Sequence, residues 1–133
     1  MSDMKFQALA SSSAGNAYIV SDNDTRILLE CGVTHKNLQK LSGFSLSEFQ
    51  ACLVSHEHKD HAKAVAELIS RGMEVYMSQG TAEALDAEAV TLIEHMEQFN
   101  VRRLSIYKNL PRRKGRFVCD MLQPKKRKLF ERN

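Results

Sequence analysis

The residues with the clearest chemistry in this sequence are four potential metal ligands in one short segment: His56, His58, Asp60 and His61. In an extended backbone, residues two apart project to the same side, so His56 and His58 can bind one metal ion together. If the chain then turns into a helix, Asp60 and His61 point towards a second site nearby. Neutral imidazole suits zinc, iron or manganese, and a carboxylate adds a hard donor. A metal ion held here would lower the pKa of its bound water to roughly 7 and generate hydroxide at neutral pH.

The competing interpretation of this segment is a loop of solvent-exposed polar residues. A single His-x-His would fit that interpretation. Three histidines and one aspartate at this spacing, directly after an apolar run, favour metal binding instead. Glu57 and Lys59 lie between the candidate ligands and are interpreted as ordinary loop charges.

The candidate ligands must be positioned by the elements on either side of them. Residues 51–55 form a continuous apolar run, as in a strand that is buried on both faces. Residues 62–71 place apolar side chains on one helical stripe, and Gly72 follows them. Residues 74–77 predict the next strand. Strand and helix therefore alternate after residue 50, which indicates α/β organisation.

The N-terminal part of the chain predicts three strands joined by turns, at residues 5–9, 17–20 and 26–30. Two hairpins in succession imply that the sheet begins antiparallel. A helix over about residues 34–41 should follow, with Leu38 and Leu41 facing inward. The pattern at residues 88–99 is ambiguous between helix and strand, and residues 101–107 predict a strand.

Charge is distributed unevenly along the 133 residues, whose net charge is +3. Residues 108–133 carry ten Lys or Arg against two acidic residues, which gives +8, and the rest carry nine against fourteen, which gives −5. A basic segment of this kind is typical of polyanion binding or of a solvated chain end. We therefore expect a domain over residues 1–107 and a basic C-terminal segment over residues 108–133, with candidate short strands at 117–119 and 129–130.

Composition indicates an ordinary globular domain, with 43% apolar and 26% charged residues. The first residues lack the pattern of a signal peptide, and no apolar run approaches the roughly 20 residues that cross a bilayer. The three cysteines, Cys31, Cys52 and Cys119, are scattered and lie among apolar neighbours. They are interpreted as buried free thiols, and the expected location is the cytoplasm.

The segment from Ser55 to His61 resembles, without a gap, the His-x-His-x-Asp-His signature of the metallo-β-lactamase superfamily. Residues 11–16 resemble the first-hairpin turn of its small cytoplasmic members with phosphodiesterase or DNA-exonuclease character. Residues 28–32 resemble the family segment of apolar residues, Asp, a small residue and Gly, with Glu30 in place of the Asp. The resemblance covers about residues 5–107.

This resemblance implies an α/β (α+β) fold, the metallo-β-lactamase-like αββα sandwich, with two divalent metal ions in a cleft at the sheet edge. Zinc is the expected metal, with manganese or iron as alternatives. The implied reaction is hydrolysis of an ester, amide or phosphodiester by a metal-bound hydroxide.

The resemblance also implies a role for each candidate ligand. His56 and His58 would bind the first metal, and Asp60 and His61 the second. Asp60 would also orient the attacking water, as the catalytic residue. The rim of the cleft would be lined by Ser12, Ser13 and Asn16, although a role in the hairpin turn is the stronger interpretation for these three.

The family completes its site with a later His, a bridging Asp and a last His, and this chain lacks clear counterparts. The only later histidine, His95, is interpreted as a surface or interface residue, and residues 108–115 contain no ligand. We therefore expect only the N-terminal half of the fold plus a basic tail, without the second sheet that the missing half supplies. Metal affinity should be reduced.

Three hypotheses follow. The first is a metal-dependent phosphodiesterase or nuclease, acting on nucleic acid or another phosphodiester, whose activity the missing ligands could impair. The second is a non-catalytic metal- or nucleic-acid-binding remnant that acts through its basic tail. The third is a homo-oligomer in which a second copy covers the open side of the truncated fold. None of the three involves a membrane.

Overall fold

The computed structural model describes residues 4–22 and 25–93 in full, together with the backbone of residues 98–101, 104–109, 116–121 and 130–132. The strands are β1 (Lys5–Ser12), β2 (Gly15–Ser21), β3 (Arg26–Leu29), β4 (Ala51–Leu53), β5 (Glu74–Met77), β6 (Thr91–Leu92), β7 (Gln98–Val101), β8 (Leu104–Asn109), β9 (Arg116–Met121) and β10 (Phe130–Arg132). The helices are α1 (His35–Leu41), α2 (Lys59–Ala62), α3 (Val65–Ser70) and α4 (Gln79–Leu85), with a 3₁₀ turn, η1 (Leu46–Glu48).

The first sheet contains six strands in sequence order, β1-β2-β3-β4-β5-β6. β1, β2 and β3 pair antiparallel, whereas β3, β4, β5 and β6 pair parallel. The change in direction follows from the connections, because short turns join the first three strands and helical segments join the later ones. The sequence-based expectation of an antiparallel start followed by α/β alternation is confirmed.

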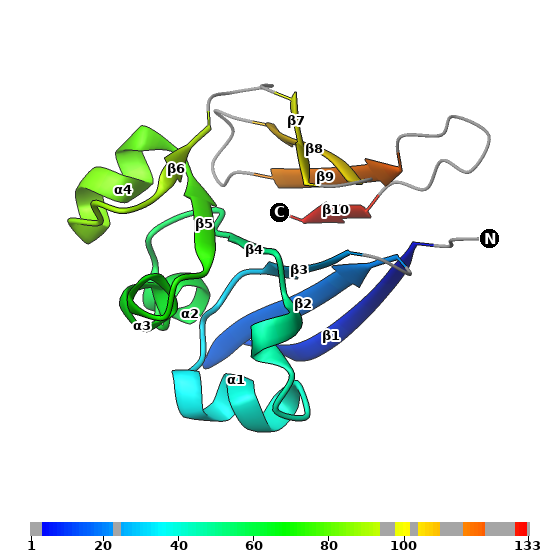
Figure 1. Cartoon of the computed structure of the whole chain (residues 1–133). Helices are drawn as coiled ribbons and strands as arrows, with labels where there is room; N and C mark the ends of the chain where they lie inside the picture. The colour runs from blue at the N-terminus through cyan, green and yellow to red at the C-terminus, as the bar shows by residue number, and fades with distance from the viewer. Residues whose placement is uncertain are drawn as a thin grey trace.

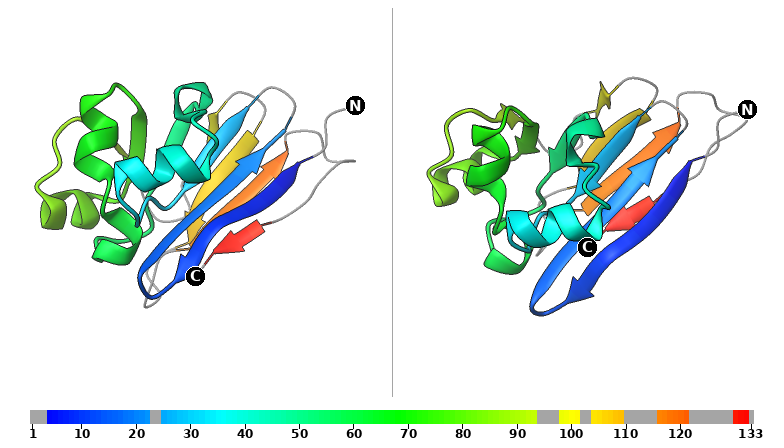
Figure 2. Two further views of the ribbon diagram at one scale, coloured as in Figure 1. Left: turned by 90° about the horizontal axis from the view of Figure 1, so that it is seen from below. Right: turned by 60° about the horizontal axis from the view of Figure 1, so that its bottom comes forward.

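A second sheet of four antiparallel strands, in the order β10-β9-β8-β7, lies across one face of the first (Figures 1 and 2). The expectation that the second sheet would be missing is therefore wrong. β8 crosses the boundary expected after residue 107, and β9 and β10 come from the basic segment. Strands had been expected at residues 101–107, 117–119 and 129–130, which overlap β8, β9 and β10, but their pairing into a second sheet had not been expected.

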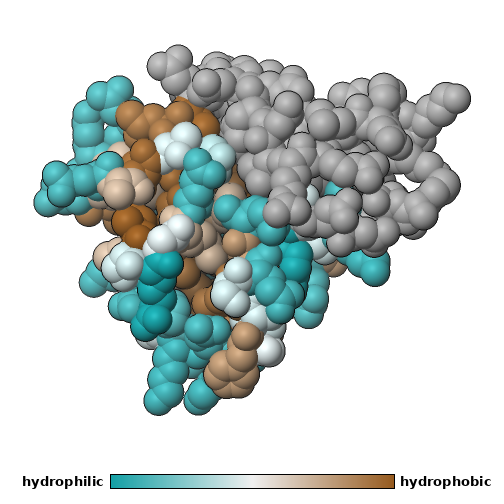
Figure 3. All heavy atoms as spheres, viewed as in Figure 1, coloured by the Kyte–Doolittle hydropathy of each residue, from teal (hydrophilic) through white to brown (hydrophobic). Residues whose placement is uncertain are grey.

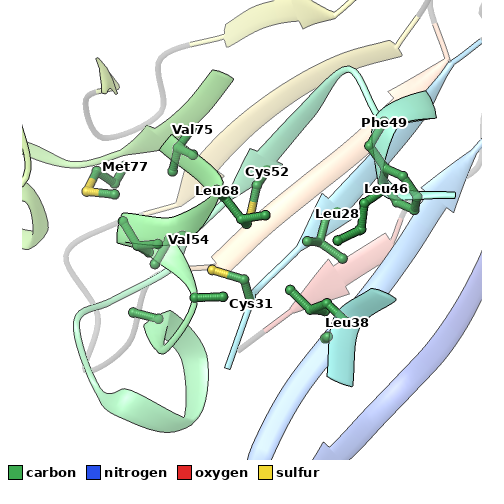
Figure 4. Close-up of a cluster of buried hydrophobic side chains, with 14 of the residues drawn as sticks. Leu28, Cys31, Leu38, Leu46, Phe49, Cys52, Val54, Leu68, Val75 and Met77 are labelled. Carbon is green, nitrogen blue, oxygen red and sulfur yellow. The ribbon is translucent and has the colours of Figure 1, made fainter. Parts of the chain in front are cut away.

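The first sheet separates two buried clusters, because successive side chains of a strand point to opposite faces. On one face, Leu28, Cys52 and Val75 pack with Leu38 of α1 and Leu68 of α3, as Figure 4 shows. On the other face lies a second cluster that contains Val20, Ile27, Leu29, Leu53 and Tyr76. The helices thus cover the face opposite the second sheet, which gives the layer order α, β, β among the described residues (Figure 1).

Two details of the helices differ from the sequence-based expectation. The helix expected over residues 62–71 corresponds to α3, which begins only at Val65, because the Ala64 N–H donates to the Cys31 carbonyl (2.9 Å) and so separates α3 from the short helix α2, which ends at Ala62. In α1, Leu38 is buried as expected, but the inward orientation expected for Leu41 is wrong, since Leu41 is 44% exposed. Leu41 lies in the last turn of α1 and its side chain faces solvent, as does that of Phe44 three residues later.

Hydrophobic residues reach the surface unevenly. In the space-filling view they gather over β5, β6 and α4, while the lower part of the same face is mostly hydrophilic (Figure 3). Among the described residues, no helix has the length and apolar character needed to span a bilayer.

Candidate metal centre

The candidate ligands lie where β4 ends, at the carboxyl edge of the parallel part of the sheet. Residues 54–58 leave β4, and His58 caps α2. The His58 carbonyl accepts from the N–H groups of His61 (2.9 Å) and Ala62 (3.0 Å), and this turn brings His61 back towards the strand end. Carboxyl ends of parallel strands are common positions for sites in α/β proteins, because the loops that follow neighbouring strands converge there.

The four candidate ligands form one cluster. The ring centroid of His56 lies 4.6 Å from that of His58 and 4.1 Å from that of His61. His61 Nε2 lies 3.5 Å from the Asp60 carboxylate. His56 and His61 are buried, Asp60 is half-buried and His58 is exposed, so the cluster opens to solvent on the His58 side.

A fifth group, Glu30, joins the cluster from the end of β3. One ligand atom from each of Glu30, His56 and His61 lies within 4.8 Å of the others, the spacing of a possible metal site. Glu30 is fully buried and has a left-handed backbone, with φ of 65°. Such a conformation is uncommon for a residue other than Gly, and it is often found at functional sites.

The Glu30 carboxylate contacts the ligand loop through two residues. Oε1 accepts from the Ser55 N–H (2.9 Å), and Oε2 accepts from the Ser55 hydroxyl in a short hydrogen bond. Ser55 Oγ in turn lies 2.8 Å from Nδ1 of His56. Nδ1 of His61 lies 3.1 Å from Glu30 Oε2, as a close polar contact rather than an aligned hydrogen bond. Sequence reasoning gave Glu30 and Ser55 no role, although an acidic residue ending an apolar strand was the available signal.

The residues that follow Glu30 hold the backbone of the ligand loop. The Cys31 N–H donates to the His61 carbonyl (2.9 Å), and the Gly32 N–H donates to the Asn16 carbonyl (2.8 Å). A Cβ on Gly32 would lie 1.8 Å from the Asp60 carbonyl oxygen, so only Gly allows this close approach of two backbones.

Asn16, at the start of β2, also contacts Asp60 and so helps to hold the ligand loop. Its Nδ2 donates to the Asp60 backbone carbonyl (3.0 Å) and lies 3.4 Å from the Asp60 carboxylate, while its Oδ1 accepts from the Tyr18 hydroxyl (3.0 Å). Asn16 is buried and so does more than form the hairpin turn. Ser12 behaves as a turn residue, since its hydroxyl accepts from the Ala14 N–H (3.1 Å), and Ser13 is exposed.

The donor set fits a divalent metal ion by its chemistry. Three imidazoles and the Asp60 carboxylate are the ligand types that zinc, manganese and iron take in proteins. Burial, reinforced by Cys31 and by the charge of Glu30, raises the pKa of the Cys52 thiol well above its usual value. Cys31 and Cys52 are buried free thiols, as expected. His95 and the side chain of Cys119 lie outside the described residues.

Fold and cluster together define a protein of the metallo-β-lactamase fold. The chain superimposes on the metallo-β-lactamase fold protein YhfI from Bacillus subtilis with a TM-score of 0.69 at 16% identity, covering 90% of this chain and 58% of that one. It superimposes on the metallo-β-lactamase SMB-1 with a TM-score of 0.73 at 16% identity, covering 98% and 61%. These structures establish the fold, and the fold class expected from the sequence is confirmed.

Within that fold, a narrower family is defined by sequence. The family model described as anti-Pycsar protein Apyc1 matches residues 6–96, and the chain belongs to this family. It is also similar to the exodeoxyribonuclease WalJ of Streptococcus pneumoniae (29% identity over 86 residues) and to the exodeoxyribonuclease YycJ of Bacillus anthracis (29% over 87 residues). Each match covers 62% of this chain but only 32% and 33% of the two relatives, so the chain spans about a third of their length.

Proposed function

We propose that this chain is a metal-dependent hydrolase of nuclease type that cleaves phosphodiester bonds. The observation that carries the proposal is the convergence of buried His56 and His61, exposed His58 and half-buried Asp60 at one strand end, with ring centroids 4.1 to 4.6 Å apart. Similarity to two exodeoxyribonucleases supports nucleic acid as the substrate class, and DNA in particular.

The ligands proposed from the sequence remain the proposed ligands. His56 and His58 would hold one divalent ion, and Asp60 and His61 a second, with zinc preferred over manganese or iron. When bound, such ions supply Lewis acidity towards a phosphoryl oxygen and lower the pKa of water towards roughly 7.

Asp60 is the proposed catalytic residue. Its carboxylate lies 3.5 Å from His61 Nε2 and 3.4 Å from Asn16 Nδ2, which can donate a hydrogen bond to it. A carboxylate fixed at this position can accept a hydrogen bond from a water molecule and orient it towards the substrate phosphorus. The half-buried setting gives Asp60 access to solvent, and the neighbouring His61 is buried.

The second hypothesis, nucleic-acid binding without turnover, predicts a different result in the same assays. Binding through the ten basic residues of the segment 108–133 would weaken steeply with salt, because each neutralised phosphate releases counterions. It would not depend on Asp60 or on added metal ions.

The test combines metal content with hydrolysis. The unmodified protein, His58→Ala and Asp60→Asn are compared with His35→Ala, a matched control because His35 lies at the start of α1, outside the cluster. Bound metal is measured by elemental analysis. Hydrolysis is measured on bis(p-nitrophenyl) phosphate and on an end-labelled single-stranded DNA.

We expect bound zinc or manganese in the unmodified protein and in His35→Ala, and its loss in His58→Ala. Hydrolysis should fall by at least about 100-fold in Asp60→Asn. Metal content at background in the unmodified protein, or cleavage that persists unchanged in both cluster variants, would overturn the proposal. Salt-sensitive DNA binding without cleavage would favour the second hypothesis.

A further inference from the structure

We infer that α1 and the turn after it form a binding surface for single-stranded nucleic acid, on which a base stacks against Phe44 while Lys36 and Lys40 contact phosphates. The inference rests on the proposed function and deepens it, because it specifies the form of nucleic acid that binds near the metal centre. Three observations carry it: the exposure of Phe44, the fixed backbone that presents this ring, and the charge of the surrounding segment.

Phe44 is the most exposed large hydrophobic residue that the structure describes, at 72%. Leu41, in the last turn of α1, is also exposed and lies three residues earlier in the chain. An aromatic ring in this setting offers a flat face to solvent. Unpaired bases stack on such faces whatever their identity, because every base has a π-face.

The backbone of the turn is held by hydrogen bonds. The Phe44 N–H donates to the Gln39 carbonyl (2.6 Å), and this contact forms part of a Schellman motif at the end of α1. The N–H of Gly43 donates to the Lys40 carbonyl (3.1 Å), as the same motif requires. In such motifs an apolar side chain at the Phe44 position frequently packs back on the helix, but the residue at the corresponding helix position is the polar Gln39. The ring of Phe44 is therefore left in solvent on a fixed backbone.

Phe44 is also a backbone outlier, since its φ of 61° lies in the left-handed region. A bulky residue rarely adopts this conformation, and residues held in it cluster at ligand-binding positions. Gly43 before it is left-handed as well, with φ of 68°. Two consecutive left-handed residues direct the chain away from the helix, which supports a binding role for the ring that follows.

The charge of the segment suits a polyanion. No acidic residue occurs between Glu30 and Glu48, and Lys36 and Lys40 lie within this stretch. The two lysines are exposed and four residues apart on α1, so they share one side of the helix. Neither forms an ion pair with another described residue. Both ammonium groups are therefore available to phosphates.

The surface begins next to the ligand loop. Gly32 packs against the backbone of Asp60, and Thr34, two residues later, caps α1 by accepting from the Asn37 N–H (3.2 Å). α1 contains seven residues and is therefore about 10 Å long. It lies on the same face of the sheet as α2, which contains Asp60 (Figure 2). A strand of a few nucleotides held at Phe44 can thus reach the metal centre.

Stacking on Phe44 requires an unpaired base. In a duplex each base is paired and presents only its edges in the grooves, whereas a single strand exposes the faces of its bases. Contacts from Lys36 and Lys40 to phosphates would position either form without distinguishing them. The aromatic ring is therefore the feature that favours single strands.

The competing partner is an anionic lipid surface, which also attracts exposed aromatic and lysine side chains. Helices that lie on membranes bury a continuous apolar face in the lipid. In α1 the apolar face packs on the protein core instead, since Leu38 is fully buried. Only Leu41 and Phe44 are apolar and exposed in α1 and the three residues after it, so the observations favour nucleic acid.

The experiment measures binding of an oligothymidylate of about 12 nucleotides, a length within the site sizes of single-strand-binding surfaces. EDTA is present so that the strand is not cleaved. The variants are Phe44→Ala, Phe44→Trp, Lys36→Ala and Lys40→Ala. Lys5→Ala, Phe6→Ala and Phe6→Trp are matched controls, because both residues are exposed at the start of β1, away from the hairpin turn that contacts Asp60.

Two further measurements separate stacking from charge. The first repeats the titrations with an oligonucleotide of the same length and charge whose bases are replaced by abasic spacers. The second uses fluorescence, since the chain contains no tryptophan and Phe44→Trp therefore places a single fluorophore on the surface. Binding through the basic segment 108–133 is common to all variants and does not alter the comparison.

We expect Phe44→Ala to weaken oligothymidylate binding by about 5- to 100-fold and to leave binding of the abasic strand unchanged. Phe44→Trp should keep the affinity, and its emission should be quenched by oligothymidylate but not by the abasic strand. Lys36→Ala and Lys40→Ala should each reduce the salt slope of log affinity by about 0.7 for both strands. The controls at Lys5 and Phe6 should match the unmodified protein.

The inference is overturned if Phe44→Ala binds oligothymidylate as tightly as the unmodified protein does, or loses affinity equally for both strands. It is also overturned if vesicles of phosphatidylserine and phosphatidylcholine, but not oligothymidylate, change the emission of Phe44→Trp. Failure of the proposed function is a separate result. A protein that holds no metal and cleaves nothing, but shows the expected dependence on Phe44, would keep this surface and lose the hydrolase proposal.

Discussion

The ligand loop, residues 56–61, and the support segment, residues 30–32, differ in how they contribute to the same site. The ligand loop contains four candidate ligands within six residues, and its side chains range from buried to exposed. The support segment contributes one buried carboxylate and a backbone hydrogen bond from the Cys31 N–H to the His61 carbonyl, and all three of its residues are buried. The identity of the ligands is therefore encoded locally, whereas their orientation depends on the parallel pairing of β3 with β4.

The largest effect is expected from Gly32→Ala, in the support segment. The new Cβ would lie 1.8 Å from the Asp60 carbonyl oxygen and 2.7 Å from the His61 N, so the ligand loop must shift. Overpacking of this kind destabilises by about 1–3 kcal/mol, and we expect zinc binding to be lost as well. Urea unfolding and zinc titration measure the two effects.

Gly80→Ala is the matched control for that substitution. Gly80 lies in α4, and a Cβ there meets nothing within 4 Å. Because Ala has the higher helix propensity, Gly80→Ala should stabilise the protein by up to about 1 kcal/mol and leave zinc binding unchanged. Equal effects of the two substitutions would show that the close contact at Gly32 is unimportant. The support segment would then not determine the orientation of the ligand loop.

Within the ligand loop, His61→Ala and His58→Ala separate metal binding from stability. Both should abolish tight zinc binding, since each removes a proposed ligand. Only His61 is buried, at 4% exposed, and its carbonyl and ring contact the support segment. His61→Ala should therefore also lower the free energy of unfolding of the metal-free protein by about 1–3 kcal/mol, whereas His58→Ala should change it by less than about 0.5 kcal/mol. Metal-free urea titrations of both variants decide this.

Asn16→Ala, which removes the hydrogen bonds from Asn16 to Asp60, should have an intermediate effect on stability and on zinc affinity. It removes the donor to the Asp60 carbonyl and the acceptor of the Tyr18 hydroxyl, both with little exposure. We expect a loss of stability of about 1–2 kcal/mol and a loss of zinc affinity of about 10-fold, because Asp60 keeps its position in α2 but loses one constraint. An affinity equal to that of the unmodified protein would show that Asn16 serves only the hairpin.

The sequence predicted the ligand loop, the strand before it and the change from antiparallel to parallel pairing, because each depends on residues close together in the chain. It did not predict the roles of Glu30 and Ser55, whose contact joins residues 25 positions apart. The break between α2 and α3 was missed for the same reason, since it depends on a bond from Ala64 to Cys31. Strands overlapping β8, β9 and β10 were expected from the sequence, but their pairing into a second sheet was not, because each pairing joins residues that are separated along the chain.

The smallest effect is expected at the two intervening positions of the ligand loop. Glu57 and Lys59 are exposed, and the described contacts of the cluster do not involve either side chain. Glu57→Gln and Lys59→Gln should therefore change stability by less than about 0.5 kcal/mol and zinc affinity by less than about twofold. In the extended segment before α2, Glu57 alternates with His56 and His58 and should point away from the site, whereas Lys59 is the first residue of α2. A loss of zinc affinity as large as that of His58→Ala in either variant would show that local charge, rather than ligand spacing, governs binding.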